Sequence, residues 1–208
     1  DSMKIQMVCL ANSNKNGGRL LVGILMKDGI PLVDAAGPRW IRLAMELKRP
    51  YIPAGLVVDI VPRDILEFEA MSVQDLRDCR GTVIFDPYSL RFLGIMDEEL
   101  IANYCISRIS NLVEGNGSAS EGPLLLKTQS CRIEVGEELP GKKHVDVSLK
   151  FKFGRFEHEF KLDDPWLLEV IKVDPEILEQ RQDHHIVLQR KIPKGQGAPV
   201  CSVMAVMF

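Results

Sequence analysis

The sequence predicts a mainly β chain with helical insertions, folded as two small β-barrels. Short apolar or alternating runs follow one another closely, and Gly, Pro, Asn and Asp punctuate the gaps between them. No long helix separates the first runs, whereas parallel strands would need long crossover connections. A closed barrel buries such strands and leaves no free edge.

The first barrel is predicted to span residues 3–114. From Ile65 to Gly122 the pattern changes to one that we interpret as partly helical. Ser72 is expected to begin one helix and Asp97 to cap a longer one that runs to about Val113. Four runs before this point have the composition of strands: Ile5–Ala11, Leu20–Met26, Trp40–Leu43 and Leu56–Val61.

A Gly- and Ser-rich stretch at 115–122 is the predicted linker or mobile loop, and 123–208 is the predicted second barrel. The clearest local prediction there is a hairpin from Val147 to Leu162, with a type II′ turn at Gly154-Arg155. One face of this hairpin should carry opposite-charge pairs, Lys150 with Glu159 and Lys152 with Glu157. The other face is expected to point inward with four aromatic side chains: Phe151, Phe153, Phe156 and Phe160.

The sequence after this hairpin predicts two short helices and two final strands. Asp164-Pro165 and Asp174-Pro175 each place a capping Asp before a Pro at the first helical position, so two short helices should follow the hairpin. Residues 184–192 and 200–208 then predict the last two strands, the second of them almost wholly apolar.

A polar connection between the first two predicted strands is the candidate binding site. Its Asn and Ser can bond to the local backbone, and Gly17-Gly18 permits the positive φ angles of a tight turn with free amides, which suits an anion. The alternative is a plain hairpin loop. Trp40 and Arg42 lie two residues apart on a strand and should share a face, where Arg19 is expected to join them in one exposed cleft. The candidate ligand-binding residues are Asn12, Ser13, Lys15, Gly17, Gly18, Arg19, Trp40 and Arg42.

These motifs also occur in an order that resembles a prokaryotic family described as a dual OB-containing domain. The pattern ANS-x-x-x-GGR begins at Ala11 and is followed by Trp40-Ile41-Arg42, and the second half carries Cys131-Arg132-Ile133-Glu134-Val135 and Asp164-Pro165. Two positions depart from the family pattern: Leu20 stands where a Cys tends to follow GGR, and Leu43 where a Pro tends to follow WIR. The resemblance implies two OB-like barrels in one chain and brings no settled activity with it.

Composition narrows the classes of function. The chain is 46% apolar and 26% charged, as in ordinary globular proteins. No run approaches the roughly 20 apolar residues of a membrane span, and no leader pattern is present, so we expect a cytoplasmic protein. Five cysteines without a C-x-x-C motif and four histidines without ligand spacing predict reduced structural thiols, no metal site and no cofactor.

Binding fits this sequence better than catalysis. No nucleophile, phosphate-loop or metalloenzyme motif is present, so we assign no catalytic residue, and Asp59 and Asp86 are best explained as a strand position and a turn residue. Residues 1–63 carry nine Lys and Arg against five Asp and Glu, whereas 64–122 carry four against eleven. We therefore predict a binder of single-stranded DNA or RNA that uses a basic N-terminal loop and groove. The alternative is a module that binds a small nucleotide or a protein partner; no oligomeric state is predicted.

Overall fold

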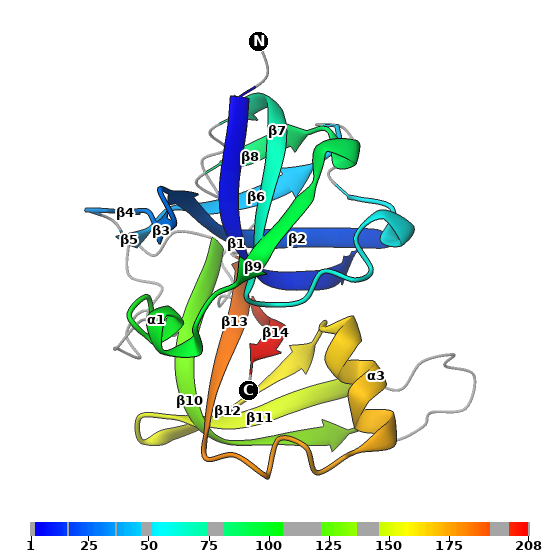
Figure 1. Cartoon of the computed structure of the whole chain (residues 1–208). Helices are drawn as coiled ribbons and strands as arrows, with labels where there is room; N and C mark the ends of the chain where they lie inside the picture. Colours follow the sequence, from blue (N-terminus) through cyan, green and yellow to red (C-terminus); the bar gives the residue numbers. More distant parts are fainter. Residues whose placement is uncertain are drawn as a thin grey trace. The chain divides into compact units, whose positions relative to one another are not determined.

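The computed structural model describes residues 3–15, 17–35, 37–46, 51–74, 81–105, 122–136, 146–191 and 200–207 (Figure 1). The chain divides into two compact units, Asp1–Tyr104 and Cys105–Phe208. The predicted linker lies outside the described residues except for Gly122, so the predicted boundaries stay a prediction.

Both units are mainly β, as the sequence predicts. In the first unit the elements are β1 (Met3–Lys15), β2 (Gly18–Lys27), β3 (Ile30–Pro31), β4 (Val33–Asp34), β5 (Gly37–Pro38), β6 (Trp40–Ala44), the 3-10 helix η1 (Ala54–Leu56), β7 (Asp64–Gln74), β8 (Thr82–Phe85), η2 (Pro87–Ser89), β9 (Arg91–Ile95) and α1 (Glu98–Ala102). In the second they are β10 (Gly122–Val135), β11 (Val147–Phe153), β12 (Phe156–Leu162), α3 (Pro165–Val173), β13 (Asp183–Lys191) and β14 (Val200–Met207).

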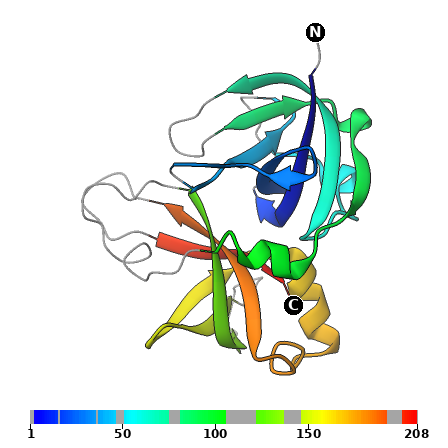
Figure 2. The same cartoon turned by 60° about the vertical axis from the view of Figure 1, so that its left-hand side comes forward.

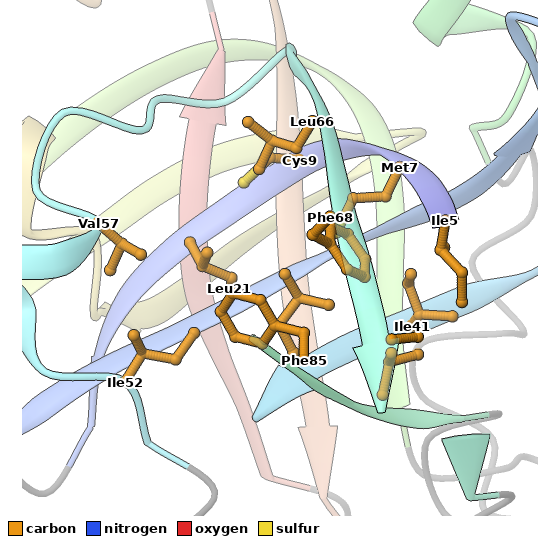
Figure 3. Packing of buried hydrophobic residues seen from close by; sticks show 13 residues of the cluster. Ile5, Met7, Cys9, Leu21, Ile41, Ile52, Val57, Leu66, Phe68 and Phe85 are labelled. Atoms are coloured by element: carbon orange, nitrogen blue, oxygen red, sulfur yellow. The ribbon is translucent and has the colours of Figure 1, made fainter. Parts of the chain in front are cut away.

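Five strands of the first unit close into a barrel in the order β1-β2-β6-β8-β7, with β7 pairing back to β1. The β6 and β8 strands run parallel, and the other neighbours are antiparallel. Numbered along the chain, the strand order is 1-2-3-5-4-1, which is the topology of the OB fold. Figure 3 shows the inner faces of these strands meeting around Phe68 and Phe85, whose rings lie edge to face with centroids 5.5 Å apart.

The second unit repeats this topology without a visible repeat in the sequence. Its closed barrel has the order β10-β11-β12-β14-β13, with β12 parallel to β14. The helix α3, gold in Figure 2, connects the third strand to the fourth. The Asp164 carboxylate caps α3 by accepting from the N–H groups of Trp166 and Leu167, and it also accepts from the Val206 N–H of β14. This one side chain therefore connects α3 to the barrel.

The predicted hairpin of the second unit is confirmed in its register. Residue pairs 150 with 159, 152 with 157 and 153 with 156 face each other, and Gly154 has φ 64° in the turn. Phe151 and Phe153 are buried, but the prediction is wrong for Phe156, which is 58% exposed. Phe156 directly follows the turn, at the end of the hairpin, and it is absent from the residues that form the barrel core.

The sequence misplaced the fourth strand of the first barrel. Residues 56–61, predicted as a strand, form the end of η1 and a turn, and Ser72, predicted to begin a helix, lies inside β7. The true strand has its own alternation, since Leu66, Phe68 and Ala70 are buried and the glutamates between them are not. The apolar run before it covers the end of the barrel, where Val57 joins the core.

Two predicted helices are shorter than expected or absent. Asp97 does cap α1, accepting from the Glu99 N–H at 2.9 Å, but α1 ends at Ala102 and turns follow it. The rest of that predicted helix lies outside the described residues. After Asp174 the residues 175–180 form turns instead of a helix. The last two strands are confirmed as β13 and β14.

Candidate nucleic-acid interface

The tip of the β1–β2 hairpin forms the exposed part of the predicted site. Lys15 pairs with Gly18 at the end of the ladder, and Gly17 has φ 83°, in the left-handed region that favours glycine. Arg19 exchanges two backbone hydrogen bonds with Ile52, of 2.7 and 2.9 Å. A Cβ atom on Gly18 would lie 2.9 Å from the Ile52 carbonyl oxygen, so this close approach requires glycine.

Asn12 and Ser13 are buried beneath this tip and do not line an open surface. They are 8% and 2% exposed. The Asn12 side-chain amide donates to the carbonyl oxygens of Val57 and Ile60, each at 2.8 Å. These bonds connect β1 to the turn that covers the end of the barrel, so the contacts of Asn12 are structural.

Trp40 and Arg42 share one face of β6, as predicted. Ile41 and Leu43, which alternate with them along β6, belong to the core. Trp40 and Arg42 therefore lie on the outer face of the strand. Trp40 is only 8% exposed, and the Arg42 guanidinium donates to the buried Thr82 hydroxyl at 3.0 Å. Neither side chain is presented to solvent in the way that the predicted stacking surface requires.

The predicted convergence of Arg19 and Arg42 on one cleft is wrong. Arg42 pairs with Val22 of β2, three residues from Arg19. Because strand residues alternate between faces, residues three apart point to opposite sides, so Arg19, half-buried near the start of β2, lies on the side opposite to Arg42. Proximity along two neighbouring strands was not enough to bring these cations together.

An aromatic residue outside the predicted set lies beside the hairpin tip. The Cβ atom of Tyr51 is 3.1 Å from the position of a Cβ atom built on Gly18, and Tyr51 is half-buried. The sequence offers Tyr51 only as one of four candidates for stacking on a base, with Trp40, Tyr88 and Trp166, and does not place it at this turn. Its position depends on the bridge between Arg19 and Ile52, which joins segments more than thirty residues apart.

Two cations on the outer face of the second barrel, Lys150 and Arg132, are paired with carboxylates. The Lys150 ammonium lies 3.2 Å from Glu134 and 3.5 Å from Glu159, and Arg132 lies 3.2 Å from Glu134 and 3.0 Å from Glu157. The hydrogen bond from Lys150 to Glu134 raises the pKa of Lys150, and the Ser148 hydroxyl lowers the pKa of Glu159. Among the described residues of this network, two cations face three carboxylates, so the network itself has no surplus of positive charge.

The carboxylates singled out from the sequence have local roles. Asp86 caps η2 by accepting from the Tyr88 N–H at 3.0 Å, and Asp59 lies exposed in a turn. Within the residues that the structure describes, no cluster of His, Cys, Asp and Glu could hold a metal ion, and no helix is long and apolar enough to cross a membrane. Cys9, Cys105, Cys131 and Cys201 are reduced, and Cys79 lies outside the described residues.

No protein-family model matches this sequence. A search of curated proteins also finds no match. Similar solved structures include a murine DNA-binding protein bound with double-stranded DNA, at 10% identity and TM-score 0.42, covering 100% of this chain and 93% of that chain. A replication protein A heterotrimer bound to single-stranded DNA matches at 10% identity and TM-score 0.43, covering 99% of this chain and 49% of that chain, about half its length. The p204 HINb domain matches at 9% identity and TM-score 0.39, covering 97% of each chain.

Identities and TM-scores this low assign no function. The strand order of each barrel defines the class by itself: this is a protein with two OB-fold barrels.

Proposed function

We propose that this chain binds single-stranded nucleic acid, DNA or RNA, at the tip of its N-terminal barrel. The observation that carries the proposal is the placement of a tight glycine turn, Arg19 and Tyr51 together at the loop between the first two strands of an OB barrel. This loop is one of the two that OB folds use to contact oligonucleotides. A guanidinium suits a phosphate, and a tyrosine ring suits a base.

The predicted site residues divide into two groups in this proposal. Lys15, Gly17, Gly18 and Arg19 would contact the ligand, together with Tyr51. The buried residues Asn12, Ser13 and Trp40 and the Thr82-bonded Arg42 would shape the barrel beneath it.

Two related inferences remain proposals. The motif order supports membership in the prokaryotic dual OB-containing family, and the two OB topologies are what that membership implies. Free thiols at Cys9 and Cys131 support a reducing compartment, and we infer a cytoplasmic location.

The test is fluorescence anisotropy with labelled single-stranded DNA and RNA of several lengths at two salt concentrations. Arg19→Ala should weaken binding to all sequences and lower the slope of log K against log salt by about 0.7, the value for one phosphate contact on a single strand. Lys27→Ala is the matched control, because Lys27 is an exposed cation at the other end of β2. Equal effects of the two substitutions would refute the assignment of the tip.

The alternative is a small-nucleotide site at the same turn. A mononucleotide needs only the turn amides and one cation, so its affinity would match that of the polymer and would not rise with length. An affinity that grows with length supports the polymer, and an affinity independent of length supports the nucleotide.

A further inference from the structure

The β9 strand carries an apolar surface that the first barrel does not bury. Its side chains Phe92, Leu93 and Ile95 are 60%, 50% and 62% exposed. Within the described part of the chain, β9 pairs only with β7, so its other edge is open (Figure 1). Exposed apolar edges are unusual in a folded protein, because they invite pairing with another strand.

The sequence of this edge is complementary to itself in the antiparallel direction. When a second copy is aligned about Gly94, Arg91 lies opposite Asp97 and Leu93 opposite Ile95. The cation therefore meets a carboxylate, and these two exposed apolar residues meet each other; Met96, opposite Phe92, is buried in its own barrel. Arg91 and Asp97 are both exposed. Self-complementarity of this kind is what a twofold interface requires, since residue i must fit residue j in both directions.

The backbone around the axis leaves room for this approach. A Cβ atom built on Gly94 meets no atom within 4 Å, so the centre of the edge is unobstructed. Met96 donates its N–H to the Arg63 carbonyl of the first barrel, which turns the backbone groups of Ile95 outward. A bulge adds Leu93 to β9 between its paired positions and interrupts the regular row of free groups. We therefore expect side-chain contacts to stabilise the association more than backbone hydrogen bonds between the two strands.

We propose that two copies of this chain associate through antiparallel apposition of their β9 strands about a twofold axis at Gly94. Leu93 of each copy packs against Ile95 of the second copy, and Arg91 pairs with Asp97 of the second copy. Charge complementarity favours a second copy over an unrelated partner, because both halves of the match lie on the same seven residues.

Sedimentation equilibrium of the full chain over a wide concentration range at low salt tests the proposal. The wild-type protein should show a reversible monomer–dimer equilibrium. Arg91→Asp and Asp97→Arg each place like charges opposite one another twice, so each should raise the dimer Kd by about tenfold or more. An equimolar mixture of the two variants brings opposite charges together again and should dimerise like the wild type. Lys27→Asp makes the same charge change as Arg91→Asp at an exposed position outside β9 and should leave the equilibrium unchanged.

Asp97 also caps α1, so Ile95→Asp provides a variant that leaves this cap intact. It places a carboxylate against Leu93 of the second copy and should abolish the dimer, while the circular dichroism spectrum stays that of the wild type. A wild-type protein that is monomeric throughout, or a dimer that persists in Arg91→Asp and Ile95→Asp, would overturn the proposal. A larger wild-type complex formed only with another protein would equally refute the self-association.

Discussion

Gly18 shows how a single residue sets the geometry of the hairpin tip. Its missing side chain leaves room for the Ile52 carbonyl, whereas Gly17 beside it has open space and needs glycine only for its positive φ angle. We expect Gly18→Ala to cost about 2 kcal/mol through overpacking and Gly17→Ala about 1 kcal/mol through backbone strain. Urea denaturation measures both. A smaller loss for Gly18→Ala than for Gly17→Ala would contradict the close approach.

Asp64 is a buried carboxylate whose ionisation opposes folding. It is 5% exposed, and burial raises its pKa above the usual value even though its oxygen accepts from the Val61 N–H at 2.9 Å. Because the pKa of Asp64 is higher in the folded than in the unfolded state, the protonated carboxyl favours folding relative to the ionised one. Its contribution to the free energy of unfolding is complete below the unfolded pKa of 3.8 and is lost as the pH rises through the folded pKa.

Asp64→Asn should therefore raise the free energy of unfolding at neutral pH, because the amide oxygen can keep the bond to Val61 without a buried charge. The gain should shrink as the pH falls toward the unfolded pKa of Asp64. Denaturant unfolding at several pH values checks this, with the exposed Asp59→Asn as control. A gain that grows on acidification would show that the sign is wrong.

At the scale of single elements, the β11–β12 hairpin separates a structural face from a charged face. Phe151 is fully buried and packs with His158 and Phe160 at centroid distances of 5.6 and 5.8 Å, whereas Lys150 lies in the charged network on the other side. Phe151→Ala should cost about 3–5 kcal/mol, whereas Lys150→Ala should cost little because exposed ion pairs contribute little. A denaturation series compares them, and similar losses would contradict the inward register.

The same hairpin shows how far local pattern alone predicts an element. Alternation and the Gly-Arg turn predicted the register of the three central pairs 150 with 159, 152 with 157 and 153 with 156, because each contact in a tight hairpin lies close in the sequence. The segment 56–61 has an equally apolar composition, yet it forms no strand. An apolar segment forms a strand only where a neighbouring strand can pair with it. In this barrel the position of the fourth strand is occupied by β7 and not by residues 56–61.

Over the whole molecule, the balance of charge limits how a nucleic acid could bind. The net charge is −3, and Lys150 and Arg132 on the second barrel's outer face are paired with carboxylates. We therefore expect a modest salt dependence, with a slope of log K against log salt no steeper than about −3, and an affinity that stops rising beyond a short oligonucleotide. Anisotropy titrations over a length series measure both. A slope several times steeper would require a second contact surface.

The sequence by itself determined the class of fold and the existence of a glycine turn with a cation beside it, because strand alternation and turn chemistry are local properties. The tertiary structure decided which residues meet at that turn. Barrel closure brings Ile52 and Tyr51 to Gly18, and the period of two along β2 and β6 sends Arg19 and Arg42 to opposite faces. Such meetings depend on register between strands distant in the chain, and one residue of register changes which face a side chain occupies.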